Sequence, residues 1–156
     1  MAWLGFALLT VFTWGVYGLL LHTGTMGMAD PVNGRYKAFL FVGLAYLLVA
    51  VFAPLVVLKL HRVALGSLPT NGMVWSTIAG VAGAIGAFGV LLAFGNKGTP
   101  AMVMSIVFAG APVVNAIASM IVHPPAGGVG AIRWPFALGI ALAAAGGCLV
   151  TLYKPA

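Results

Sequence analysis

The chain has 156 residues, of which 63% are hydrophobic and only 5% are charged. Soluble domains are about 45–50% apolar and about 25% charged. Seven basic residues and one acidic residue are too few to cover a water-soluble surface, so the composition excludes an ordinary soluble domain and predicts an integral membrane protein. The net charge of +6 comes almost entirely from presumed loops, where anionic headgroups attract basic residues. No basic patch is dense enough to predict nucleic-acid binding.

Continuous apolar runs predict helical spans. In lipid the backbone must satisfy its own hydrogen bonds, and the runs do not alternate as membrane-barrel strands do. A spanning helix needs about 20 mostly apolar residues. We therefore predict an all-α integral membrane protein, a bundle of about five transmembrane helices in a single membrane domain over residues 1–156. The predicted spans are Trp3–Leu21, Ala38–Leu58, Met73–Phe94, Ala101–Val122 and Trp134–Tyr153. The first is expected to be retained, because it lacks the basic n-region of a signal peptide.

Basic residues in short loops ordinarily fix the orientation of a membrane protein. Here they are nearly balanced between the two sides. Two interpretations stay open: another feature fixes one orientation, or the protein inserts both ways and pairs antiparallel. The side of the N-terminus carries Lys59, Arg62 and Arg133, and the other side carries Arg35, Lys37, Lys97 and Lys154 together with Asp30.

The first span carries a polar and aromatic stripe. Thr10, Thr13, Trp14 and Tyr17 follow i, i+3, i+4, i+7 spacing and so share one helix face. The remaining faces are Leu, Val and Phe, which suit lipid. The stripe is expected to line a cavity or to pack against a neighbouring helix, although Thr hydroxyls often bond to their own helix backbone.

Two spans contain a proline. Pro54 follows Tyr46 in the second span and frees the carbonyl group of Ala50, which predicts a kink. Pro112 frees the carbonyl group of Phe108 in the same way, less than one turn before Asn115. An amide in the bilayer is costly without a partner, so Asn115 is expected to bind either a nearby protein group or a substrate. Both prolines are candidate hinges.

Small residues recur along the third and fifth spans at three- and four-residue intervals. Such faces let membrane helices approach closely, within one chain or between two chains. The predicted helix-packing residues are Gly80, Gly83 and Ala87 in the third span and Gly139, Ala143 and Gly147 in the fifth.

Several residue types and motifs that define common functions are missing from the sequence. No acidic residue lies inside a span, and His22, His61 and His123 fall at span ends, which disfavours carboxylate-based proton exchange. No motif for metal binding, nucleophilic catalysis or phosphate binding is present. We therefore predict a protein that is not an enzyme and that needs no metal or cofactor. The lone Cys148 cannot form an intramolecular disulfide.

Several motifs resemble one half of an EamA-type carrier of the drug/metabolite transporter superfamily. They are the Trp14-Gly15 and Tyr17-Gly18 pairs, the stretch GVAGAIGAFGVLLAFGNKGTPA between the third and fourth spans, and AGAPVVNAIAS around Pro112. Members of that family usually carry two five-helix repeats of opposite orientation in one chain, whereas this chain has one. The resemblance implies a homodimer or a separate partner half, with a central cavity reached by Thr13, Trp14, Tyr17, Pro112 and Asn115.

The predicted function is a small-solute or metabolite transporter that works by alternating access, as a dimer or with a partner half, in the bacterial inner (plasma) membrane. Its partners are the lipid bilayer and a small-molecule substrate. The alternative is a non-transporting subunit or scaffold that binds other helices through its Gly/Ala faces. A small multidrug-type exporter is disfavoured by the missing intramembrane carboxylate. The substrate-cavity candidates are Thr13, Trp14, Tyr17, Tyr46 and Asn115.

Overall fold

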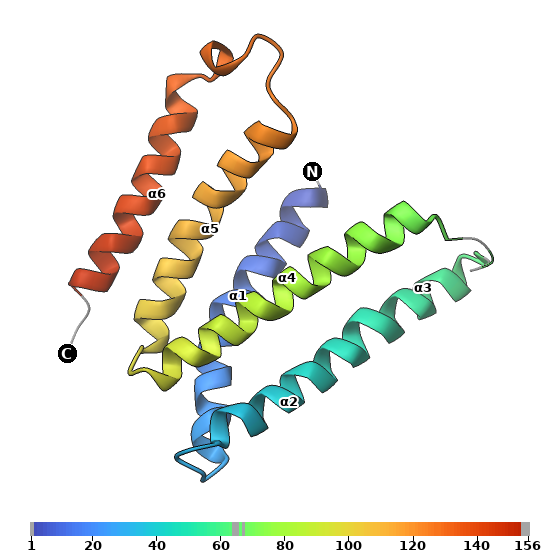
Figure 1. The fold of residues 1–156 in the computed structure, drawn as a ribbon, viewed down its shortest axis with the longest axis vertical. Coiled ribbons are helices and arrows are strands. Elements are labelled where there is room, and N and C mark those ends of the chain that lie inside the picture. The colour runs from blue at the N-terminus through green and yellow to red at the C-terminus, as the bar shows by residue number, and fades with distance from the viewer. Residues whose placement is uncertain (1, 64–65, 67, 154–156) are drawn as a thin grey trace. The chain divides into compact units, whose positions relative to one another are not determined.

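The computed structural model describes residues 2–63, 66 and 68–153, and in these residues it contains helices and no strands (Figure 1). Lys154, one of the predicted loop cations, lies outside them. Five helical segments are long and apolar enough to cross a membrane. The predicted all-α class with about five spans is therefore confirmed, and the protein is a multi-pass integral membrane protein. The chain forms two compact units, residues 1–96 and residues 97–156. The single membrane domain over residues 1–156 stays a prediction.

The first unit contains three of the spanning segments. α1 (Ala2–Gly27) is followed by α2 (Gly34–Leu47), the π-helix η1 (Leu48–Phe52) and α3 (Ala53–Leu60), which together make one long rod (Figure 1). α4 (Thr70–Gly95) packs against both α1 and α2. Leu21 of α1, Ala38 of α2 and Leu91 of α4 are buried. This apolar core is small, as expected for helices whose outer faces contact lipid.

Aromatic contacts hold α4 against the other two helices. The ring of Phe88 lies with its centroid 5.4 Å from that of Phe39 and 6.4 Å from that of Tyr36 in α2. The ring of Phe94 meets His22 of α1 edge-on, with the centroids 5.6 Å apart. These contacts gather at the C-terminal end of α4, so that end of the unit is its best-packed part.

Arg35 packs against the last residue of α4. A Cβ atom at Gly95 would collide with the Arg35 guanidinium, so the absence of a side chain there makes room for the cation. A cation beside a helix C-terminus interacts favourably with the helix dipole. Arg35 was predicted as a loop cation, but it lies in the first turn of α2 and serves the packing of this unit.

The second unit is a helical hairpin. α5 (Pro100–Val122) leads through the short 3₁₀ helix η2 (Val129–Ala131) to α6 (Trp134–Leu152), and α5 packs against α6. The Thr99 side chain accepts a hydrogen bond from the backbone N–H of Met102 at the start of α5. Proline at position 100 suits the first turn, whose N–H groups have no helical partner.

The observed helices differ from the predicted spans mainly at their ends. α1 continues to Gly27, beyond the predicted end at Leu21, because Thr23 and Thr25 donate their hydroxyl groups to the carbonyl oxygens of Leu19 and Leu21 and so stay helical. The other segments shift by a few residues, to Gly34–Leu60, Thr70–Gly95, Pro100–Val122 and Trp134–Leu152.

Most large apolar side chains point outward. Phe12 is 70% exposed and Leu40 is 74% exposed. In water such a surface would aggregate, whereas in a bilayer it contacts acyl chains. The described residues therefore fit a lipid environment along the full length of the spanning helices.

Candidate functional site

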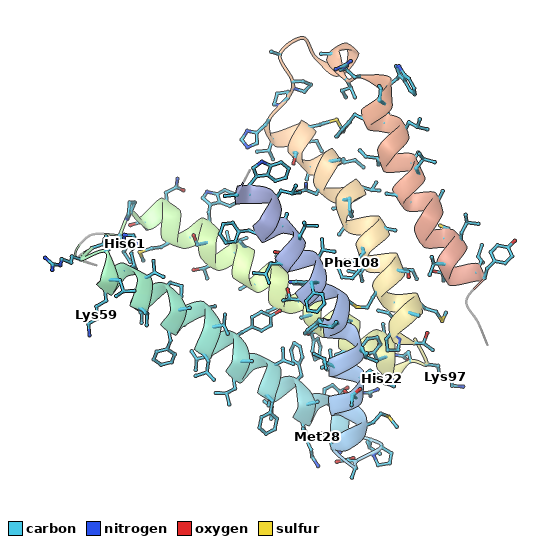
Figure 2. The ribbon with its side chains drawn as sticks, turned by 180° about the vertical axis from the view of Figure 1, so that it is seen from behind. His22, Met28, Lys59, His61, Lys97 and Phe108 are labelled. Atoms are coloured by element: carbon cyan, nitrogen blue, oxygen red, sulfur yellow. The ribbon has the colours of Figure 1, made fainter. Side chains whose placement is uncertain are left out.

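A cavity of about 810 Å³ lies between α1 and the α2–η1 segment. This volume is in the range of roughly 300–1,000 Å³ typical of small-molecule sites. Figure 2 shows Met28, just after α1, near one end of the α2–α3 rod, and Lys59 and His61 at the other end. The α2 and η1 part of this rod forms one wall of the cavity. The cavity is lined by Thr13, Trp14, Tyr17, Leu20, Leu21, Gly24, Met28, Ala38, Phe41, Val42, Ala45, Tyr46 and Val49.

The α1 wall carries three of the four residues of the predicted stripe, Thr13, Trp14 and Tyr17, whereas Thr10 does not line the cavity. The Trp14 and Tyr17 rings are in contact, with their centroids 5.7 Å apart. The Thr13 hydroxyl donates to its own helix, to the carbonyl oxygen of Leu9 at 3.0 Å. The Tyr17 hydroxyl is different, because it is buried and has no hydrogen-bond partner among the described residues. A buried hydroxyl without a partner costs free energy, so this group is free to bind a ligand atom.

The α2 wall contributes Tyr46 and, from the π-helix, Val49. Pro54 follows this π-helix within two residues and cannot donate a hydrogen bond to the carbonyl oxygen of Ala50. A π-helical turn often marks a functional site or a bend. The backbone irregularity predicted at Pro54 thus lies next to the cavity, while its role as a hinge stays a prediction.

A second pocket, of about 610 Å³, lies between α5 and α6. Its polar side chains are Asn115, Ser119, His123 and Arg133, and none of them has a side-chain hydrogen bond or ion pair with the described residues. Pro112 also lines it, but α5 runs through Pro112 without interruption, unlike the segment before Pro54. The full lining is Pro112, Asn115, Ala116, Ser119, Met120, His123, Pro125, Ile132, Arg133, Phe136 and Ile140.

Four of the five predicted cavity residues come together. Thr13, Trp14, Tyr17 and Tyr46 line the cavity of the first unit, whereas Asn115 lines the pocket of the second. Asn115 does not bond to the Phe108 carbonyl group freed by Pro112 (Phe108 is labelled in Figure 2). That these residues meet in one central cavity stays a prediction.

Sequence reasoning missed most of the α2 wall. Phe41, Ala45 and Val49 line the cavity at four-residue intervals, which places them on one helix face. The spacing was available in the sequence. However, the helix is apolar on every side, so no contrast marked this face as the inner one.

The predicted helix-packing residues fall into two groups. Ala87 is only 1% exposed, and Gly147 is buried with Ala109 against it. A Cβ atom at Gly80, Gly83 or Gly139 would have nothing within 4 Å, and Ala143 is exposed. Within each unit, therefore, only Ala87 and Gly147 have the predicted close contacts.

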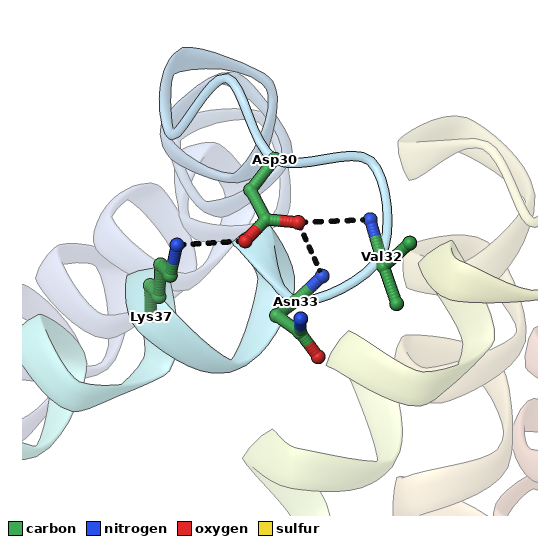
Figure 3. A network of polar contacts seen from close by, with 4 residues as sticks. All are labelled: Asp30, Val32, Asn33 and Lys37. Atoms are coloured by element: carbon green, nitrogen blue, oxygen red, sulfur yellow. Dashed lines mark hydrogen bonds and ion pairs between the residues drawn. The ribbon is translucent and has the colours of Figure 1, made fainter.

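Asp30 organises the turn between α1 and α2 (Figure 3). One carboxylate oxygen accepts hydrogen bonds from the backbone N–H groups of Val32 at 3.1 Å and Asn33 at 2.8 Å. The other accepts from the Lys37 ammonium group at 2.7 Å. The bond from Lys37, followed by the bond from Asn33, lowers the pKa of Asp30 from its ordinary value of 3.8 to about 2. Asp30 is therefore charged at neutral pH. It stabilises the turn and does not take up or release protons at that pH.

We expect the carboxyl group of Asp30 to titrate near pH 2 in the folded protein and nearer 3.8 in Lys37→Gln. Because the folded pKa is depressed, the stabilisation from this network is present above about pH 4 and disappears as the pH falls through about 2. Carbon NMR of the labelled carboxyl group in detergent measures both midpoints. A wild-type midpoint at the ordinary value, unchanged in Lys37→Gln, would contradict the pairing.

No protein-family model matches the chain, and no curated protein or solved structure is significantly similar to it. Among the described residues, no group of three or more His, Cys, Asp or Glu side chains is placed to bind a metal ion. The function is therefore inferred from the two pockets and from the chemistry of the residues that line them.

Proposed function

We propose that the protein is a small-solute or metabolite transporter, a single-repeat half of EamA type in the drug/metabolite transporter superfamily, and not an enzyme. The observation that supports this most directly is the 810 Å³ cavity between α1 and α2. Its walls combine aromatic surface with a few hydroxyl groups, as is usual in small-molecule sites. The bacterial inner membrane is the proposed location.

The cavity is open on one side, which supports a dimer or a partner half. Trp14 is 37% exposed and Tyr46 is 44% exposed although both line the cavity. Aromatic surface of this kind is expected to be covered by a second wall, either from another copy inserted antiparallel or from a separate half. Alternating access then consists of movement of one half against the other around the solute, and the π-helix before Pro54 is the candidate hinge.

The chemistry of the cavity also limits the mode of transport. None of its lining residues is charged or a histidine, and Asp30 keeps its charge at neutral pH. We therefore propose facilitated diffusion or exchange, or coupling through hydroxyl and carbonyl groups, rather than carboxylate-based proton exchange.

We expect the purified chain alone, in proteoliposomes, to carry out saturable exchange of at least one solute in a panel of labelled amino acids, sugars, nucleotide sugars and drugs. Exchange is measured as entry of labelled solute into vesicles loaded with the same unlabelled solute. Vesicles without protein control for leakage. Absence of exchange throughout the panel, with the folded protein present as a dimer, would contradict the proposal.

The alternative function is a membrane subunit or scaffold without transport activity. It is favoured by the open glycine face of α4, where a Cβ atom at Gly80, Gly83, Gly86 or Gly89 would have nothing within 4 Å. Small-residue faces of this kind bind other helices in membranes. Stable co-purification with a larger complex, together with no solute exchange, would support this alternative.

A further inference from the structure

We propose that the pocket between α5 and α6 binds one anionic phospholipid, with its phosphate at His123 and Arg133 and an acyl chain along the groove towards Pro112. Binding of this lipid requires that the protein is inserted in the membrane, but it does not require transport activity. It is measured as lipid retained by the protein and not as solute flux.

The charge of the pocket favours an anionic ligand. The chain contains one acidic side chain, Asp30, and that carboxylate is paired with Lys37 at 2.7 Å. Arg133 therefore has no side-chain carboxylate left to pair with anywhere in the chain. Among the described residues its guanidinium group has no hydrogen-bond partner. A guanidinium group forms its strongest hydrogen bonds with carboxylates and phosphates, so an external anion is the expected partner.

The two basic residues lie at a depth in the membrane that suits a lipid headgroup. His123 immediately follows α5 and Arg133 immediately precedes α6, so both stand where a span meets the membrane surface. The α6 N-terminus has no side-chain cap, and its partial positive charge adds to that of Arg133. Basic pockets between spanning helices suit anionic headgroups.

The length of the groove matches one leaflet of a bilayer. Pro112 and His123 are eleven residues apart on α5, or roughly 16 Å along the helix axis. This is close to half of the roughly 30 Å hydrocarbon thickness of a bilayer. The groove thus spans one leaflet, and its walls between the two ends are mostly apolar, with Ala116, Phe136 and Ile140 beside the polar Asn115 and Ser119. A soluble anion would use the polar end of such a groove and leave its apolar length empty.

The test compares lipid retention by the delipidated protein in detergent, using mixed micelles that contain phosphatidylglycerol or phosphatidylcholine. Native mass spectrometry counts the lipid molecules bound per chain. We expect preferential retention of phosphatidylglycerol, reduced roughly tenfold in Arg133→Gln, because hydrogen bonds to charged groups are among the strongest in proteins. The matched control is Arg62→Gln, which removes an arginine outside the pocket and should retain lipid like the wild type.

A second variant keeps the proposal testable if Arg133→Gln does not fold. Ala116→Leu narrows the groove without changing charge and should also lower retention of phosphatidylglycerol. Equal retention of the two lipids, or equal behaviour of Arg133→Gln and Arg62→Gln, would overturn the proposal. Hexyl phosphate tests whether the pocket instead binds a soluble organic anion. If hexyl phosphate binds at Arg133 and phosphatidylglycerol does not displace it, the lipid assignment is wrong.

Discussion

Gly147→Leu is expected to destabilise the α5–α6 hairpin by roughly 1–3 kcal/mol, the usual cost of forcing a larger side chain into a packed contact. Gly147 is buried, and a Cβ atom there would collide with Ala109 and would lie 3.1 Å from the carbonyl oxygen of Ser105. Leucine cannot fit unless α6 moves away from α5. The free energy of unfolding in detergent is measured by monitoring helix content with circular dichroism.

Gly139→Leu is the matched control for that substitution. Gly139 lies on the same helix, and a Cβ atom there would have nothing within 4 Å. Both substitutions gain the same helix propensity, about 1 kcal/mol per glycine replaced, so the difference between them isolates the contact with Ala109. Similar unfolding free energies for the two variants would show that this contact does not hold the hairpin together.

The same pair of glycines illustrates what the sequence could predict. Intervals of four residues place Gly139, Ala143 and Gly147 on one face of α6, because that periodicity depends on the helix alone. Which members of the face are covered depends on the neighbouring helix, and of the three only Gly147 has a close neighbour in its unit. Contacts of this kind could not be predicted from one span considered by itself.

The spans and the first cavity wall were the most predictable features. Apolar length alone identifies a helix that crosses a bilayer, and all five predicted spans are helical. The spacing of Thr13, Trp14 and Tyr17 placed them on one face of α1, and all three line the cavity. Apart from Tyr46, the opposite wall was missed because α2 offers little polar contrast among its apolar residues.

The two prolines show a different limit. Each removes one helical hydrogen bond, and the sequence assigned both the same role. The structure has a π-helix directly before Pro54 but an uninterrupted α5 through Pro112. How a helix accommodates a missing bond depends on the packing around it, so residue type alone does not distinguish the two outcomes.

The cavity should respond most strongly to loss of its aromatic surface. If the proposed transport activity holds, we expect Trp14→Ala to lower solute exchange roughly tenfold or more, since a large aromatic ring that packs on a bound solute commonly contributes more than about 1.4 kcal/mol to binding. Trp3→Ala is the matched control, because Trp3 lies on the same helix, is 70% exposed and does not line the cavity.

Tyr17→Phe separates hydrogen bonding from aromatic surface. It removes only the buried hydroxyl that has no partner among the described residues. If that hydroxyl binds the solute, the apparent affinity falls several-fold, in line with a hydrogen bond of roughly 1 kcal/mol, while the folded protein becomes no less stable. Tyr153→Phe, at a residue that is 78% exposed, should change neither property.

The initial rate of exchange against solute concentration gives the affinity, and a thermal melt gives the stability. Unchanged affinity together with a higher melting temperature would mean that the Tyr17 hydroxyl is only an uncompensated buried group, and that the solute is recognised elsewhere in the protein.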